Sequence, residues 1–433
     1  MKYIIFAILF FCCFKIIKSS GVDKFIWLMV GMLMINSMYS PIVLSNSHYT
    51  LSLSYLVSLF FDPQFNRDFK TYPLRSISVA ICVIYLLIAL FSKSLSLMPS
   101  LYRAVIDYSI SFLMLFAGYH AIQKIEDYDK ILNVLAPIVL VSSVYGLICF
   151  VLKTNPYNSL VGISEVGVDY NISEAVRGYR IAGFCNTSNP HAHLLTVGSF
   201  LLINRKVNKL TVAISILSLA NLLLSDSRAP IADLIILILI YLLCSKNLTR
   251  NVIYIFAGIL LVSFLPGIMD VINHTLNNFL DTFSDSGKNE VSGSSLALRL
   301  TQFKSALPYF MESPLFGHGF SFFSEKIGQV GTTNNGLYGM ESYILWLMVE
   351  YGGVMAIAAV IFYTKLIQTI LIFKRNSYYK IPLALVITLI VHILLNRPVD
   401  VYEYFLPFIG IGLKLLTFSN SNSIKKIQFS TAL

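Results

Sequence analysis

Long apolar stretches separated by short polar turns run through almost the whole chain. A transmembrane helix needs about 17–25 predominantly apolar residues, and several of these stretches reach that length only with their flanking residues. One stretch, residues 48–61, is shorter and more polar, and it forms either a span or an interfacial segment. The candidate spans are residues 3–17, 25–44, 48–61, 77–91, 104–122, 131–152, 193–203, 210–224, 231–244, 253–269, 342–373, 381–395 and 404–418. The pattern predicts an all-α polytopic membrane protein with about 12 transmembrane helices.

One polar stretch, residues 270–340, is far longer than the other turns. Within it, residues 296–311 place leucine and phenylalanine at helical spacing, which predicts a helix lying at the membrane interface. A structureless loop of this length is unusual inside a compact domain unless it has a function. We therefore expect a large loop that carries short helices and contributes to a functional site.

Composition places most of the chain in lipid. Hydrophobic residues make up 56% of the 433 residues and charged residues only 12%, whereas soluble domains carry about 25% charged residues. No long stretch lacks spans, so residues 1–433 are predicted to form a single integral membrane domain. The net charge of +10 does not indicate a nucleic-acid partner, because lysine and arginine gather in the cytoplasmic loops of membrane proteins.

The positions of the basic residues predict which loops face the cytoplasm. Lysine and arginine cluster at residues 205–209, 246–250 and 374–380 and at the C-terminal end, which places these segments on the cytoplasmic side. The alternate loops then face outward, and they are residues 153–190, 225–230, 270–340 and 396–403. In residues 270–340 the acids outnumber the bases, which fits an extracytoplasmic loop.

The first candidate binding motif is the outward segment that contains Arg177, Arg180 and Gly183. Arginine presents a planar, permanently charged fork that grips phosphate through two hydrogen bonds. A glycine such as Gly183 lets the backbone approach a ligand closely. The alternative is that Arg177 and Arg180 reach toward lipid headgroups, and the sequence leaves both interpretations open.

Two further motifs carry arginines. Arg228 follows the turn at residues 225–227, where local pairing and helix capping favour a structural role, although Arg228 pointing into a site stays open. Arg299 lies on the expected interfacial helix, where an arginine usually faces solvent. Gly317 and Gly319 enclose a histidine in the turn after that helix, and a lone Gly-x-Gly is only a weak indication of a ligand-facing backbone.

Two acids lie on the span that follows this loop. Glu341 opens the span, where a carboxylate is stabilised by about 0.3–1 kcal/mol through the helix dipole alone. Glu350 lies deeper, where a charge costs about 2.5–3.5 kcal/mol and is a functional candidate by default.

No metal site is predicted. His191 and His193 have the spacing of metal ligands, but no carboxylate or cysteine lies near them in the sequence. Of the six cysteines, all but Cys185 lie in apolar segments, and no CxxC pattern occurs.

Taken together, the stretch from Arg177 to the C-terminus resembles the O-antigen ligase/polymerase family of polytopic bacterial glycosyltransferases. The resemblance rests on the order of the motifs: Arg180-x-x-Gly183 before a span, Ser227-Arg228 after one, Arg299 before Pro314-Leu-Phe-Gly317-x-Gly319, and the helix opening at Glu341. Ligases of the family carry histidine, then Asn, Ser or Gln, then nine residues and glycine. Here Glu341 stands at the histidine position, with Ser342 and Gly352 at the family spacing. In lacking this histidine, the chain is similar to polymerases of the family.

The resemblance implies a GT-C-like, metal-independent glycosyltransferase without a cofactor. It would lie in the bacterial cytoplasmic (inner) membrane with its active site facing the periplasm. The implied substrate is an oligosaccharide on undecaprenyl diphosphate, and the implied partner is a protein that regulates chain length. Arg180 and Arg299 would stabilise the leaving diphosphate, and Glu341 would deprotonate the acceptor hydroxyl. The substrate-binding residues would be Arg177, Gly183, Arg228, Gly317 and Gly319.

Two other functions remain alternatives. An O-antigen ligase belongs to the same family, and the missing histidine disfavours it. A lipid-linked oligosaccharide flippase would carry charges along several spans. Here the central spans are nearly uncharged except for Asp107 and Asp233, which favours the enzyme.

Overall fold

A computed structural model describes most of the chain as helices joined by short turns. It describes residues 2–35, 37, 39, 46–161, 179–185, 187–205, 207–225, 227–244, 296–323, 342–395 and 401–430. Within these ranges the structure contains helices and no strand. The prediction of an all-α protein is therefore confirmed for the part of the chain that the structure describes.

Most of the helices coincide with predicted apolar stretches, but those at Phe65–Thr71 and Pro156–Val161 were not predicted, and the predicted span at residues 104–122 is divided at Ser111. The helices are α1 (Lys2–Lys18), α2 (Gly21–Met34), α3 (Ser47–Phe60), α4 (Phe65–Thr71), α5 (Arg75–Phe91), α6 (Leu97–Ile110), α7 (Phe112–Ala121), α8 (Ile125–Leu152), α9 (Pro156–Val161), α11 (Ser188–Arg205), α12 (Lys209–Leu224), α13 (Arg228–Leu243), α17 (Leu296–Glu312), α19 (Tyr343–Ile372), α20 (Lys380–Leu395) and α21 (Tyr402–Ser430). The predicted interfacial helix is α17. The predicted span at residues 253–269 lies outside the described residues.

Fewer helices have the length and hydropathy needed to cross a membrane than the sequence predicts. Among the described residues, α8 and α19 are each long and apolar enough to cross a membrane alone. Two bent pairs raise the number to four if each pair is one span: α4 with α5, bent by 104°, and α6 with α7, bent by 42°. The count of about 12 spans stays a prediction.

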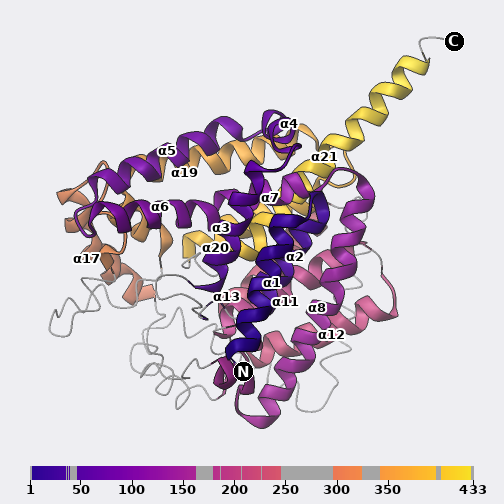
Figure 1. The fold of residues 1–433 in the computed structure, drawn as a ribbon, viewed down its shortest axis with the longest axis horizontal. Helices are drawn as coiled ribbons and strands as arrows, with labels where there is room; N and C mark the ends of the chain where they lie inside the picture. Colours follow the sequence, from indigo (N-terminus) through magenta and orange to yellow (C-terminus); the bar gives the residue numbers. More distant parts are fainter. Residues whose placement is uncertain are drawn as a thin grey trace.

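The helices form two groups that meet at a central pair. Figure 1 shows α5, α6 and α19 side by side, with α17 against α19 at their end. The second group consists of α8, α11, α12 and α13, which pack against one another. Between the groups, α7 packs along α21 and also contacts α2. The C-terminal half of α21 extends away from the other helices (Figure 1).

The polar turns gather at opposite ends of α11 and α13, as their alternation in the sequence predicts. At one end Arg180 contacts the turn before α13. At the far end of α11, Arg205 forms an ion pair with Asp129 at 2.7 Å. At the far end of α13, the Tyr379 hydroxyl donates to the Cys244 carbonyl at 3.4 Å. The two classes of loop are thus separated by the length of the helices, while the assignment of one end to the outside stays a prediction.

Helix α19 is broken at Gly352, where the sequence pattern predicted a continuous span. Gly352 has φ 77° and ψ 178°, so the backbone groups on either side lack helical partners. The loop at residues 313–321 supplies them. The amides of His318 and Gly319 donate to the carbonyls of Val349 and Glu350, both at 2.9 Å. In return, Gly353 N–H donates to the Pro314 carbonyl at 2.7 Å.

A substitution at Gly317 tests how closely the loop at residues 313–321 packs against α19. We expect Gly317→Ala to destabilise the protein by more than about 3 kcal/mol, because the added Cβ combines backbone strain with overpacking. Gly317 has φ +67°, and a Cβ there would lie 2.4 Å from the Glu350 carbonyl oxygen. Gly21→Ala is the matched control, because Gly21 has φ +53° and nothing within 4 Å of its Cβ position. Thermal unfolding in detergent should separate the two variants, and equal losses would contradict the seating described here.

A buried chain of charges joins the N-terminal helices to α21. Lys24 on α2 pairs with Asp62 at 2.7 Å, and Lys414 on α21 pairs with Asp68 at 3.0 Å. His120 on α7 lies between the two carboxylates, 3.3 Å from Asp62 and 2.8 Å from Asp68. Burial alone would raise the pKa of Asp62, but hydrogen bonds from Lys24, a backbone amide and His120 hold it below its ordinary value. The network satisfies each buried charge with a partner of opposite sign or a hydrogen-bond donor.

Candidate functional site

The structure brings two of the predicted motifs together through Arg180. Arg180 Nε donates to the Ser225 carbonyl at 3.0 Å, and Nη2 donates to Ser227 Oγ at 2.9 Å. Ser227 Oγ in turn donates to Ser188 Oγ, 3.1 Å away at the start of α11. The half-buried guanidinium is therefore held where α12 ends and α11 and α13 begin. Both motifs lie in loops that the sequence predicts to face outward, and their contact is a feature of the tertiary fold.

Arg228 is the first residue of α13, directly after this turn. Its side chain is half-buried. The local partner that the sequence suggested, Asp226, lies outside the described residues. A role for Arg228 in binding stays a prediction.

Gly183 has a packing reason to be glycine. Its φ is +55°, and a Cβ there would lie 2.4 Å from Nδ1 of His191. Its carbonyl accepts a hydrogen bond from Asn155 Nδ2 at 2.8 Å. The described contacts of Gly183 thus fix the segment between Arg180 and α11. Contact between Gly183 and a ligand stays a prediction.

Gly317 and Gly319 are likewise seated on protein. Gly317 packs on the Glu350 carbonyl, as described above, and a Cβ on Gly319 would lie 2.0 Å from Ser92 Oγ. Glu350 is buried, and its carboxylate accepts a hydrogen bond from the Phe323 amide at 2.9 Å. These contacts give Glu350 a structural role that the sequence analysis did not foresee, because its partner belongs to a different segment.

The side chains of three predicted site residues lie outside the part of the chain that the structure describes. Arg177 and Glu341 lie outside the described residues, and Arg299 is described only by its backbone within α17. The convergence of Arg180, Arg299 and Glu341 at one site stays a prediction.

A polar pocket that the sequence did not indicate lies beside the Arg180–Gly183 segment. Its volume is about 210 Å³, and its lining includes Phe184, Cys185, His48 and Glu403. His48 Nδ1 and Glu403 Oε2 form a short hydrogen bond, and His48 Nε2 lies 3.0 Å from the Ile35 carbonyl oxygen. A carbonyl only accepts, so Nε2 carries a hydrogen. The buried imidazole of His48 and the carboxylate of Glu403 therefore form a hydrogen-bonded pair that lines the pocket.

An apolar groove ends next to this pocket. The groove has a volume of about 860 Å³ and runs between α1, α3 and α6, where Leu53, Val57 and Met98 line it. At its polar end, Arg103 lines the groove and donates to the Tyr49 hydroxyl at 3.1 Å. Tyr49 also lines the polar pocket. The Arg103–Tyr49 hydrogen bond lies between the groove and the pocket, and an apolar groove next to polar groups suits a molecule with a hydrocarbon tail and a polar head.

These features define a helical protein with candidate membrane-spanning helices, an apolar groove and a neighbouring pocket with polar groups. Comparison with known families gives the class. Residues 213–361 match the family model Wzy_C, described as O-Antigen ligase. The chain therefore carries a domain of the O-antigen ligase/polymerase family, whose enzymes ligate or polymerise lipid-linked glycans in surface-polysaccharide biosynthesis at the inner membrane. No curated protein matches the chain.

The family match confirms the resemblance and narrows its extent. It includes Arg228, Arg299, Gly317, Gly319 and Glu341. Arg177, Arg180 and Gly183 precede it, although the motif comparison had begun at Arg177. The contact of Arg180 with Ser225 and Ser227 ties this preceding segment to the matched domain.

Proposed function

We propose that the protein polymerises a bacterial surface polysaccharide, such as an O-antigen. It would transfer a growing glycan from undecaprenyl diphosphate to a new lipid-linked repeat unit. The observation that carries the proposal is an apolar groove next to a pocket with polar groups, linked by the hydrogen bond from Arg103 to Tyr49, in a chain with a Wzy_C domain. The apolar lining of the groove suits a polyprenyl tail, and the polar groups of the pocket suit the hydroxyl groups of sugars. The site would face the periplasm.

The polymerase is favoured over the ligase because Glu341 stands where ligases of the family carry histidine. In the transfer step, an acceptor hydroxyl oxygen attacks the anomeric carbon of the growing chain. The bond from that carbon to the diphosphate oxygen breaks, and the diphosphate lipid leaves with the electron pair. Arg180 and Arg299 would stabilise the negative charge on the leaving group, which removes the need for a metal in this step.

The acceptor proton needs a base, and Glu341 is the first candidate. Glu403 is the second, because its carboxylate lines the polar pocket, where it is hydrogen-bonded to His48. A chain-length regulator is the expected protein partner. Substrate binding would involve Arg177, Gly183, Arg228, Gly317 and Gly319.

We expect Glu341→Gln to abolish polymer while leaving a single capped repeat, because glutamine keeps the shape of the side chain but does not accept the proton. The measurement is the glycan ladder on a gel from a deletion strain carrying each variant at equal membrane level. Glu403→Gln is the matched variant: normal ladders for Glu341→Gln with single repeats for Glu403→Gln would transfer the role of base to Glu403.

The deletion strain itself tests the function. A polymerase deletion leaves one repeat attached to the lipid A core. A ligase deletion leaves polymer on its lipid carrier, and a flippase deletion leaves no repeat on the outside. Either of the last two patterns would overturn the proposed function.

A further inference from the structure

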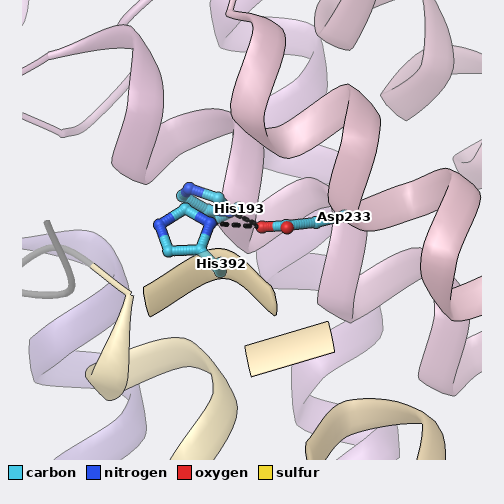
Figure 2. Close-up of side chains that lie close together, drawn as sticks. All are labelled: His193, Asp233 and His392. Carbon is cyan, nitrogen blue, oxygen red and sulfur yellow. Dashed lines mark hydrogen bonds and ion pairs between the residues drawn. The ribbon is translucent and has the colours of Figure 1, made fainter. Parts of the chain in front are cut away.

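Three buried side chains from three helices point at one another below the Arg180 turn. His193 comes from α11, Asp233 from α13 and His392 from α20, and each is at most 3% exposed. Figure 2 shows both imidazole rings directed at the same carboxylate oxygen. His193 Nδ1 lies 3.3 Å from Asp233 Oδ2, and His392 Nδ1 lies 2.8 Å from it.

The cluster is incompletely satisfied by the protein itself. His392 forms a hydrogen bond with Asp233, but His193 Nδ1 makes none, although it is buried and close to the same oxygen. A buried nitrogen without a hydrogen bond destabilises the folded protein, because it has lost its contact with water and gained nothing in exchange. A carboxylate in an apolar helix bundle also needs a positive partner. One cation between the three groups would satisfy both requirements.

We propose that His193 Nδ1, Asp233 Oδ2 and His392 Nδ1 bind a divalent transition-metal ion, with Zn²⁺ the best match. Two imidazoles and one carboxylate are a ligand set that zinc commonly takes. Zinc binds these atoms at about 2.0–2.2 Å, so tetrahedral ligands lie about 3.3–3.5 Å apart. The ligand atoms of the cluster lie within 4.8 Å of one another. The distance of 3.3 Å from His193 Nδ1 to Asp233 Oδ2 fits this geometry directly, and ion binding would lengthen the distance of 2.8 Å from His392 Nδ1 to Asp233 Oδ2 by about 0.5–0.7 Å.

The three proposed ligands lie far apart in the sequence, so no local motif indicates this site. No carboxylate lies near His193 in the sequence, so the sequence alone predicts no metal site there. The fold supplies Asp233 from α13, and His392 from a helix 159 residues beyond Asp233. His191, the other histidine of the pair, is not part of the cluster, because its Nε2 lies near Asn221 Oδ1 at 3.4 Å.

The ion has a structural role rather than a catalytic one. Asp233 lies five residues after Arg228, which is about 7.5 Å along α13. Fixing Asp233 to α11 and α20 therefore fixes the start of α13 and the turn that holds Arg180. The inference does not depend on which glycan the protein transfers, because it concerns only the packing of three helices.

The test is the metal content of the full-length protein purified in detergent without a metal-affinity tag. After incubation with Zn²⁺ and removal of free ion, we expect about one zinc per wild-type chain by inductively coupled plasma mass spectrometry. Asp233→Asn and His392→Gln should each reduce that content at least tenfold. His191→Gln is the matched control, a buried histidine on the same helix outside the cluster, and it should retain zinc. Equal zinc in wild type and both ligand variants would overturn the site.

Spectroscopy and stability give a second readout that does not depend on every variant folding equally well. Co²⁺ in place of zinc should give the visible absorption of a tetrahedral ion in wild type. Zn²⁺ should also raise the thermal unfolding midpoint of metal-free wild type and leave that of Asp233→Asn unchanged. A wild-type protein that takes up neither ion and shows no shift would mean that the three side chains form an internal hydrogen-bond network only.

Discussion

Replacing Arg180 by alanine is expected to lower the rate of glycan transfer by about 100-fold or more, because one preorganised donor to developing charge contributes about that factor. The structure explains why this arginine is preorganised. Its contacts with Ser225 and Ser227 hold the guanidinium at the junction of three helices before any substrate arrives. Arg180→Lys should also be strongly impaired, because lysine lacks the planar fork that makes both contacts. The rate is measured as polymer formed from lipid-linked repeats by purified protein in detergent.

Two variants separate charge from position in this experiment. Ser227→Ala removes one neutral partner of Arg180 and should cost no more than about tenfold. Arg205→Ala is the control, since Arg205 lies at the opposite end of α11 and pairs with the exposed Asp129. Full activity of Arg180→Lys would mean that the site needs only positive charge. Full activity of Arg180→Ala would remove Arg180 from the reaction.

The sequence predicted most helices because apolar stretches of this length have few other structures open to them in lipid. It failed where a distant segment decides the local backbone. Nothing in the apolar run at residues 342–373 reveals that α19 breaks at Gly352, because the break depends on the loop at residues 313–321 donating and accepting the displaced hydrogen bonds. The glycine pair at 352 and 353 was a usable signal, although glycine is also tolerated in unbroken transmembrane helices.

In the candidate site, too, some features follow from the local sequence pattern and others depend on distant segments. Hydrophobic and charge patterns placed Arg180 and the turn at residues 225–227 in loops on the same side, and the structure brings them into contact. No local pattern could pair His48 with Glu403, because 355 residues separate them. Each alone resembles an ordinary polar residue at the start of an apolar helix. A hydrogen-bonded pair of this kind is specified by tertiary packing, so it becomes visible only when α3 and α21 are placed together.

The largest effect on stability is expected at the buried charge chain, with Asp68→Ala destabilising the protein by roughly 3–5 kcal/mol. Asp68 is 1% exposed and accepts from Lys414 at 3.0 Å, His120 at 2.8 Å and Gln123 at 2.7 Å. Removing the carboxylate leaves the buried ammonium of Lys414 without its counter-charge. The loss is measured as the decrease in unfolding free energy or in the thermal midpoint in detergent.

Asp129→Ala is the matched control for this prediction. Asp129 also pairs with a basic residue, Arg205, at 2.7 Å, but its side chain is 52% exposed. Exposed pairs contribute about 0–1 kcal/mol, so this variant should unfold close to wild type. A double variant, Asp68→Ala with Lys414→Met, should recover part of the loss, because it removes the stranded charge together with its partner. If Asp68→Ala were as stable as Asp129→Ala, water would have to reach Lys414, and the chain of charges would not be a dry connection between α2, α7 and α21.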